Sequence, residues 1–437
     1  MSGTDFKLLR MSRKIGRAAV PSTPTRGAST KRQSRREAIL AEAALAFNAR
    51  GIAGTSINDI AAKLELPRAA VYYYVDDRDD LVFQTYLRSC ELAADDLEAA
   101  YEDAESGLDR LIGYVRRALD AERETSAVLS EIPYLSGPTR AVVEKANKRN
   151  IDAIRRFIRD GIADRSIRDC DADVAANTIV GLLSWAPLWP AWIGGAGKTA
   201  STFRQTVANA SVELLTDGIA ADPNVKVRCP IDVETFRPRP ANVFDRRDAQ
   251  AMKMDQIAIT ASRLFNRQGI DGTSLDQICE VLGATKGALY HYFADKQELV
   301  LHCYRRGFDL FETFVDTAAH AGRSGLERGV IGLHLNVQAQ AGELSPLMPQ
   351  PGLDVLPARE RTRITQRAAA IEQKFEAFGR QGRVDGSHRD CDLNTISLVG
   401  AGVFAWVPKW FEPSDTRAVW RTADETADFF IRGLRRR

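Results

Sequence analysis

The sequence has few of the residue patterns that build catalytic or metal centres. Six cysteines occur among 437 residues without a C-x-x-C pair, and the five histidines form no His/Cys cluster at metal-ligand spacing. No G-x-S-x-G motif or Cys/His arrangement indicates a nucleophile. We therefore expect free thiols, no metal, no cofactor and no enzymatic activity.

Long apolar runs are also missing. No stretch reaches the ~18 apolar residues that a membrane span needs, and the N-terminus lacks the apolar segment of a signal peptide. The hydrophobic fraction of 44% is ordinary for a globular protein, and strand-like alternation is scarce. These features predict an all-α, cytoplasmic protein with no membrane partner.

Positive charge is concentrated at the N-terminus. The net charge is +2, but residues 1–36 carry ten Lys/Arg and one Asp, a net of +9, so the remaining residues sum to −7. The segment is rich in Pro, Ser, Thr and Gly, and we expect a disordered basic tail over residues 1–33. Such a tail either lies along a DNA groove or is solvated without a role.

The chain contains the same pattern twice. Residues 47–82 and 265–300 align without a gap at an offset of 218, with 15 identities in 36 positions. Further on, R-D-C-D (168–171 and 389–392) is followed at the same distance by W-x-P-x-W (185–189 and 406–410). Two matched blocks in the same order indicate a duplicated domain, and duplex DNA is a partner that offers the matching two-fold symmetry.

Helical periodicity and turn residues divide each copy into a head and a longer body. The expected domains are head 1 (34–94), body 1 (95–220), a Pro-rich linker (221–250), head 2 (251–312) and body 2 (313–437). Copy 1 below means head 1 with body 1, and copy 2 means head 2 with body 2. Long helices are expected at 108–130, 138–162, 172–188 and 200–219 in copy 1, and at 326–342, 357–381, 392–408 and 415–434 in copy 2.

Each head reads as a helix-turn-helix, whose second short helix can enter a major groove. Residues 273–299 run T-S-L-D-Q-I-C-E-V-L-G-A-T-K-G-A-L-Y-H-Y-F-A-D-K-Q-E-L. This resembles the DNA-binding domain of the TetR family of bacterial repressors, with T-[ST] before the second helix, a turn containing Gly, [ST]-K-G-x-[LI]-Y-x-[YH]-F, and a Lys shortly afterwards. The resemblance implies two fused TetR-like units, each a helix-turn-helix domain plus a helical ligand-binding and dimerisation domain.

The residue chemistry of copy 2 agrees with that resemblance. Hydroxyls and helix N-terminal amides can hold phosphate oxygens, lysines add charge toward the backbone, and a glycine permits close approach. The expected DNA-binding residues of copy 2 are Thr273, Ser274, Thr285, Lys286, Gly287, Tyr290, His291 and Lys296. Leu289 and Phe293 are expected to pack inward.

Copy 1 departs from the pattern. Glu65 replaces the turn glycine, Pro67 replaces the hydroxyl cap, and four aspartates (Asp76, Asp77, Asp79 and Asp80) surround Arg78. The aspartates either weaken DNA binding or face the dipole of the next helix. The expected DNA-binding residues are Thr55, Ser56, Arg68, Tyr72, Tyr73 and Arg78. Our hypothesis is that copy 2 reads DNA more strongly than copy 1.

The resemblance also implies that the last two helices of each body build a four-helix dimer interface. The two copies then pair either within one chain, as a pseudo-dimer, or between chains, as a homodimer. The tryptophans Trp185, Trp189, Trp406 and Trp410 are similar in spacing to a pattern near the dimer helix of some acyl-CoA-sensing members. They indicate either a small-molecule effector of acyl-CoA type or packing residues at the interface.

These observations predict a sequence-specific transcriptional regulator, a ligand-released repressor that binds double-stranded DNA at a two-part operator. The alternative is an interaction protein that binds a small molecule or a protein and whose helix-turn-helix units are relics. The acidic turn of copy 1 favours the alternative, and the intact motif of copy 2 opposes it.

Overall fold

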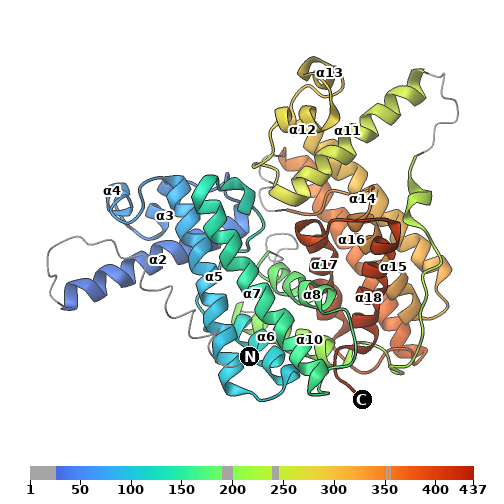
Figure 1. Ribbon diagram of the computed structural model, residues 1–437. Coiled ribbons are helices and arrows are strands. Elements are labelled where there is room, and N and C mark those ends of the chain that lie inside the picture. The colour runs from blue at the N-terminus through green and yellow to red at the C-terminus, as the bar shows by residue number, and fades with distance from the viewer. Residues whose placement is uncertain (1–25, 189–199, 239–245, 351–352, 354–355) are drawn as a thin grey trace.

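The computed structural model describes residues 26–188, 200–238, 246–350, 353 and 356–437, and it is helical (Figure 1). Copy 1 contains α2 (Arg26–Arg50), α3 (Ile57–Lys63), α4 (Arg68–Val71), α5 (Arg78–Asp103), α6 (Gly107–Ala118), η1 (Ile132–Tyr134), α7 (Gly137–Ala163), α8 (Ala172–Trp185) and α10 (Ala200–Asp217). After η2 (Val233–Phe236), copy 2 contains α11 (Arg246–Gln268), α12 (Leu275–Leu282), α13 (Lys286–Tyr290), α14 (Lys296–Ala321), α15 (Gly325–Ala341), α16 (Ala358–Val384), α17 (Leu393–Trp410) and α18 (Thr416–Arg432).

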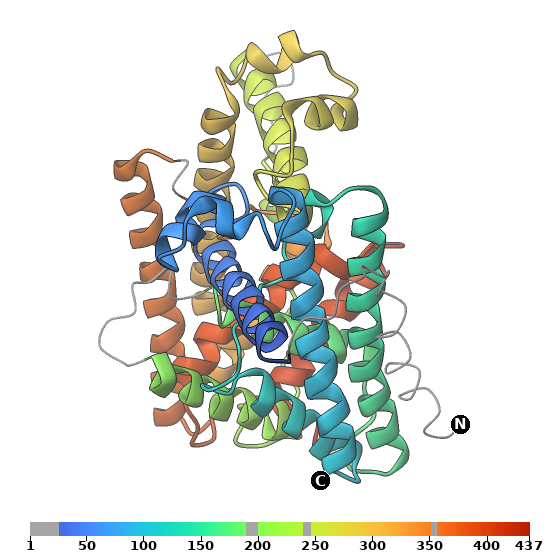
Figure 2. The same cartoon turned by 90° about the vertical axis from the view of Figure 1, so that its left-hand side faces the viewer.

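The expected all-α fold is confirmed: within the described ranges, extended pairing is limited to two isolated β-bridges. None of the described helices is long and apolar enough to cross a membrane. The two heads lie at separate tips of the molecule, α4 at the left and α13 at the top of Figure 1, and Figure 2 separates them from a second direction. The bodies meet between them.

Most helix boundaries agree with the sequence expectation, but one helix is much shorter than predicted. The helix expected over 108–130 ends at Ala118, and residues 119–136 form an irregular segment with only the short turn η1. Asn48 of α2 explains why, because its amide donates to the Ser126 carbonyl (3.0 Å) and accepts from the Val128 N–H (2.8 Å). Backbone groups satisfied by a side chain need no helix.

The two bodies pack against each other within one chain, as a pseudo-dimer. Helices α8 and α17 cross where two glycines meet: a Cβ atom on Gly181 would lie 2.8 Å from the Gly402 carbonyl oxygen, and one on Gly402 would collide with Trp185. Because neither glycine has a side chain, the two backbones approach directly. The hydrophobic core around this crossing contains residues of both copies, such as Leu182 and Val403.

The last helices of the copies cap each other reciprocally. Arg168 of copy 1 donates to the carbonyls of Leu434 and Gly433 at the end of α18, and Arg389 of copy 2 donates to those of Ile219 and Gly218 at the end of α10. Gly218 and Gly433 have positive φ, +66° and +65° respectively, as helix-terminating glycines do. The repeated R-D-C-D motif is therefore an interface element, in which each arginine satisfies carbonyls of the other copy.

The expected linker 221–250 is partly ordered against body 2. The side chain of Gln338 in α15 accepts from the Val233 N–H (3.2 Å) and donates to the Ile231 carbonyl (3.0 Å). Val233 is buried, and α11 already begins at Arg246. The described part of this segment is thus bound to body 2, unlike a flexible linker that contacts neither copy. The basic tail is expected over residues 1–33; residues 1–25 lie outside the described residues, and α2 is already helical from Arg26.

Replacing Gly402 by Leu should disrupt the pairing of the bodies. The new side chain collides with Trp185 and the Gly181 backbone, which we expect to destabilise the folded state by more than about 2 kcal/mol. Gly113→Ala in α6 is the matched control, because its Cβ would make an ordinary 3.6 Å contact with Ala100. The measurement is the urea midpoint of each variant. Equal midpoints for Gly402→Leu and Gly113→Ala would contradict the tight crossing.

Candidate DNA-binding surface and ligand pocket

The helix-turn-helix of copy 2 is closed by its own side chains. Ser274 and Gln277 form a capping box at the start of α12, and Gly283 ends that helix with φ +61°. Thr285 then caps α13 by accepting from the Ala288 N–H (3.2 Å). The motif requires an N-cap at the start of each of the two helices and a left-handed residue between them. Ser274, Thr285 and Gly283 occupy these positions.

The exposed face of α13 carries the residues expected to meet DNA. Lys286 and Gly287 are exposed at its start, and Tyr290 (50% exposed) and His291 at its end. Lys286 Nζ lies 2.6 Å from Asp276, in an exposed ion pair that a phosphate can replace. On the opposite face Leu289 and Phe293 are buried, as expected, and they pack into the core of copy 2.

Two threonines are placed differently from the expectation. Thr55 and Thr273 are buried, and their hydroxyls donate to the carbonyls of Gly51 (2.9 Å) and Gly269 (2.8 Å). These hydroxyls hold the turn after the first helix of each head, so the expectation that they face phosphates is wrong for this conformation. Their neighbours Ser56 and Ser274 are exposed at helix N-termini, where each forms a capping box, with Asp59 and Gln277 respectively.

Two expected cationic contacts are partly withdrawn from the surface. Arg78 is half-buried, and its guanidinium donates to the Ile52 carbonyl, so it joins α5 to the end of the first helix of head 1. Lys296 is also half-buried; desolvation lowers its pKa, and the nearby Asp271 opposes that shift. Both residues contribute positive charge to the head, but neither extends freely into solvent.

The recognition helix of copy 1, α4, is a strained version of α13. Glu65 adopts φ +54° where copy 2 has a glycine, a conformation that costs a non-glycine residue about 1–2 kcal/mol. Pro67 occupies the N-cap without a side-chain hydrogen bond. Arg68 donates to the Tyr72 hydroxyl (2.9 Å), and Tyr73 is 62% exposed beneath the guanidinium of Arg32. The surface therefore still offers one arginine and two tyrosines.

Two of the four aspartates of copy 1 cap the start of α5. Asp77 accepts from the Asp80 N–H (2.8 Å), and Asp80 accepts from the Asp76 N–H (2.9 Å), at the start of α5. Copy 2 repeats this arrangement with Asp295 and Glu298. Of the two alternatives for the aspartates, the structure shows Asp77 and Asp80 at the N-terminus of α5, facing the helix dipole. Residues 76–80 nevertheless sum to −3, against −1 for residues 294–298, so head 1 is more acidic at this point.

A buried carboxylate connects the two heads. Glu131, from the irregular segment of copy 1, accepts from the Ile52 N–H of head 1 (3.2 Å). On its other side lies Gly269 of head 2, where a Cβ atom would come within 2.8 Å of Glu131 Cγ. Desolvation raises the pKa of Glu131 to about 6. Nothing in the sequence around Glu131 indicates this role, because only the pairing of the copies brings Gly269 of head 2 to it.

Lys409 of the interface helix α17 completes this junction, which comprises Ile52, Ser130, Glu131, Arg267, Gly269 and Lys409. Its Nζ atom donates to the carbonyls of Ser130 in copy 1 and Arg267 at the end of α11 (3.2 Å to the latter). Desolvation lowers the pKa of Lys409 to about 8, and the charge of Glu131 opposes that shift. One ammonium therefore ties head 2, copy 1 and the interface helix together.

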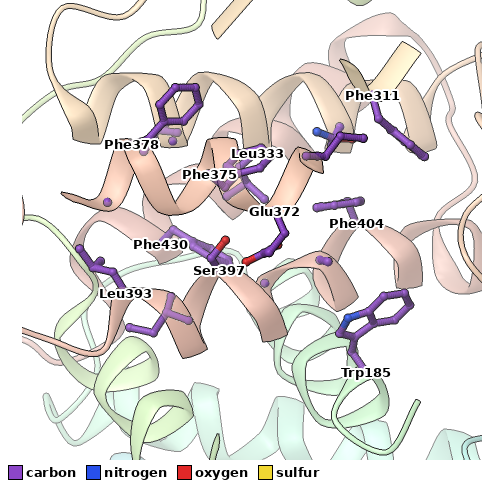
Figure 3. Close-up of a pocket in the computed structure, with 18 of the residues that line it drawn as sticks. Trp185, Phe311, Leu333, Glu372, Phe375, Phe378, Leu393, Ser397, Phe404 and Phe430 are labelled. Atoms are coloured by element: carbon purple, nitrogen blue, oxygen red, sulfur yellow. The ribbon is translucent and has the colours of Figure 1, made fainter. Parts of the chain in front are cut away.

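Body 2 contains a cavity of about 160 Å³, lined mainly by aromatic and aliphatic side chains from α14 to α18 (Figure 3). Its polar groups include Glu372 and Ser397, which lie side by side in Figure 3, and Asn336. Trp185 of copy 1 closes one end. The corresponding cavity in body 1, about 130 Å³, is bordered in turn by Trp406 of copy 2.

The repeated tryptophans are thus explained by the pairing of the copies. Trp185 and Trp406 each line the cavity of the opposite copy, so the expectations of ligand contact and of interface packing are both compatible with their positions. Trp410 packs edge-on against Phe411 with ring centroids 5.4 Å apart. Trp189 lies outside the described residues.

Comparisons with known proteins agree with this arrangement. The family described as "Bacterial regulatory proteins, tetR family" matches residues 39–85 and 257–303, and the "Tetracyclin repressor-like, C-terminal domain" family matches 104–195 and 330–434. HTH-type transcriptional regulators of Staphylococcus aureus strains USA300 and NCTC 8325 are each 34% identical over 68 residues, which is 16% of this chain and 36% of theirs. The matched region thus spans about a third of those regulators.

Solved structures similar to the chain include AibR in complex with isovaleryl coenzyme A and operator DNA, and the ketosteroid regulator KstR2 of Mycobacterium tuberculosis. AibR is 22% identical with a TM-score of 0.35, covering 41% of this chain and 97% of its own. KstR2 is 20% identical with a TM-score of 0.35, covering 41% and 93%. The four matched segments of the two family domains exceed half of the sequence. The chain belongs to the TetR family of bacterial DNA-binding transcriptional regulators and carries both family domains twice.

Proposed function

We propose that this protein is a repressor that binds a two-part operator with both heads of a single chain and is released by a small molecule in its bodies. The observation that carries the proposal is the intrachain pairing of the bodies, which presents two exposed recognition helices on one molecule. Two linked heads bind one site more tightly than either alone, because the second contact is intramolecular.

The two halves of the operator differ in this proposal. Head 2 offers Lys286, Tyr290 and His291 on a relaxed turn, whereas head 1 offers Arg68 and Tyr73 beside a more acidic helix start. An arginine at the beginning of a recognition helix suits guanine. Head 2 is therefore the stronger reader, and the operator is asymmetric.

Effector binding acts through the bodies. A ligand shifts a two-state equilibrium only if it binds one state better. The cavity of body 2 is bordered by Trp185 of α8, so its occupant contacts both copies and can change how the heads are held. Among the described residues that line this cavity there is neither Lys nor Arg, so the phosphates of an acyl-CoA would find no cation among them. This counts against the acyl-CoA hypothesis for body 2.

Lys286→Ala should weaken DNA binding and reduce its salt dependence. Sites are first selected from random duplex DNA by the full-length protein. Loss of one phosphate contact should then lower the slope of log affinity against log salt by about one.

Arg68→Ala should relax base preference in one half-site. The control is Lys226→Ala, which removes an exposed lysine of the interdomain segment and should leave DNA binding unchanged. If no sequence is enriched, the interaction-protein alternative is favoured. If two equal half-sites are recovered, the heads read DNA symmetrically and the proposed asymmetry is contradicted.

Lys409→Leu should loosen the coupling between the heads. It removes a positive charge near the buried Glu131 carboxylate, which we expect to cost about 3 kcal/mol, whereas Glu131→Gln/Lys409→Leu together should restore most of the urea midpoint. Because burial raises the folded-state pKa of Glu131 above its unfolded value, acid favours the folded state. The loss of stability in Lys409→Leu, measured against the unsubstituted protein, should therefore become smaller as the pH falls from 7.5 to 5.5.

The matched control is Lys374→Leu, which removes an exposed ion pair with Asp316 and should shift the midpoint little at either pH. Binding to the full operator should weaken in Lys409→Leu more than binding to an isolated half-site. A pH-independent deficit, or equal losses on full and half-sites, would show that the junction does not set the position of the heads.

A further inference from the structure

The cavity of body 2 has aromatic walls. Phe311, Phe375, Phe404, Phe430 and Trp185 surround it (Figure 3). Aromatic faces attract cations through their quadrupole as well as packing against apolar groups. A ligand held here therefore has an apolar body, and a positive charge on it would be tolerated by the walls.

Two residues that line this cavity each carry a buried acceptor oxygen without a hydrogen-bond partner among the described residues. Glu372 Oε1 and Asn336 Oδ1 are buried and accept from no group among the described residues. Asn336 uses its amide nitrogen to donate to the Gly332 carbonyl (2.8 Å), which leaves its oxygen free. Unsatisfied buried acceptors are costly, and in native structures they call for an explanation. A ligand with N–H donors would satisfy both.

The charge of Glu372 is also uncompensated. The Ser397 hydroxyl donates a hydrogen bond to its carboxyl group, but desolvation and the nearby Glu376 raise the pKa of Glu372 to about 7. His388, the remaining titratable residue of the lining, has its ring hydrogen-bonded to the Ile219 carbonyl (3.2 Å). Within the part of the chain that the structure describes, the lining contains neither Lys nor Arg, so it supplies an anion and acceptors but no cation.

The same positions are apolar in copy 1. Adding 221 to residue 151 gives 372, and adding 218 to residue 118 gives 336, so Glu372 corresponds to Ile151 and Asn336 to Ala118. Ile151 and Ala118 both line the cavity of body 1. The shared fold therefore does not require a carboxylate or an amide at these places. Their presence in body 2 marks a difference in what the two cavities can hold.

We propose that the cavity of body 2 binds a small organic ammonium ion, whose N–H groups donate to Glu372 and Asn336 and whose apolar body packs against the aromatic walls. The inference deepens the proposed function, because it names the effector class of a ligand-released regulator. A cavity of about 160 Å³ is close to the ~150 Å³ of an engineered cavity that holds benzene. The ligand is thus of the size of an arylalkyl amine, and the copy 1 cavity does not share it.

The test measures binding of three probes of one shape to the full-length protein by calorimetry at pH 7.5: benzylamine, benzyl alcohol and benzoate. Benzylamine should bind at least tenfold more tightly than benzyl alcohol, and benzoate should not bind. Glu372→Gln, which keeps the shape of the side chain, should weaken benzylamine at least tenfold and leave benzyl alcohol within threefold. Retained benzyl alcohol binding also shows that the variant cavity is folded.

Ile151→Ala, in the cavity of body 1, is the matched control and should leave benzylamine binding unchanged. Equal affinities for benzylamine and benzyl alcohol, preference for benzoate, an unchanged Glu372→Gln variant, or no binding of any probe would each overturn the inference. Operator binding without a probe is measured separately. If benzylamine binds as expected but leaves operator affinity unchanged, the ligand class stands and the release mechanism of the proposed function fails.

Discussion

The structure depends on the close contact between α8 and α17. Two glycines at the crossing let the backbones meet, and the arginines of the repeated R-D-C-D motif then reach the carbonyl ends of the opposite copy's last helix. Each copy satisfies backbone groups that the other leaves open. The heads have fixed relative positions only because this interface is closed within the chain. The contacts of Lys409 with the Ser130 carbonyl and of Glu131 with Gly269, which cross between the copies, exist for the same reason.

Patterns among residues close together in the sequence predicted the local structure well. The repeat, the helix periodicity and the caps at Ser274 and Thr285 depend on residues within a few positions of each other, and the helix-turn-helix follows from them. Misplacements arose where a side chain bonds to backbone groups, either far along the chain or within its own turn, in a way that periodicity does not show. Asn48 ends the helix that periodicity extends to residue 130, because it binds backbone groups of Ser126 and Val128. Thr273 looked like a phosphate ligand, but its hydroxyl is used within the turn.

The candidate site residues divide in the same way. Exposure of Lys286, Tyr290 and His291 on α13 follows from the helical pattern, since Leu289 and Phe293 must face the core. Glu131, Lys409 and Glu372 carried no signal in the sequence, because isolated charges are common and usually solvated. Only the folded chain shows that two of them share a junction and that the third lies in an aromatic cavity. The repeat did offer one clue: Glu372 aligns with an isoleucine.

Fusion of the two copies removes a constraint that binds symmetric dimers. In a two-fold homodimer each residue appears on both sides of the interface, so a charged junction or a polar cavity occurs twice. Here Lys409 corresponds, at the offset of 221, to the buried Leu188, and Glu372 corresponds to Ile151. An uncompensated buried charge lowers stability wherever it occurs. A chain that carries such a charge in only one of its two copies loses less stability than a symmetric dimer that carries it twice.

The same freedom permits head 1 to keep a strained Glu65 and an acidic helix start while head 2 keeps a relaxed turn. The unequal half-sites and the single ligand-binding body that we propose would both follow from duplication within one chain, because the two copies need to fit each other but need not be alike.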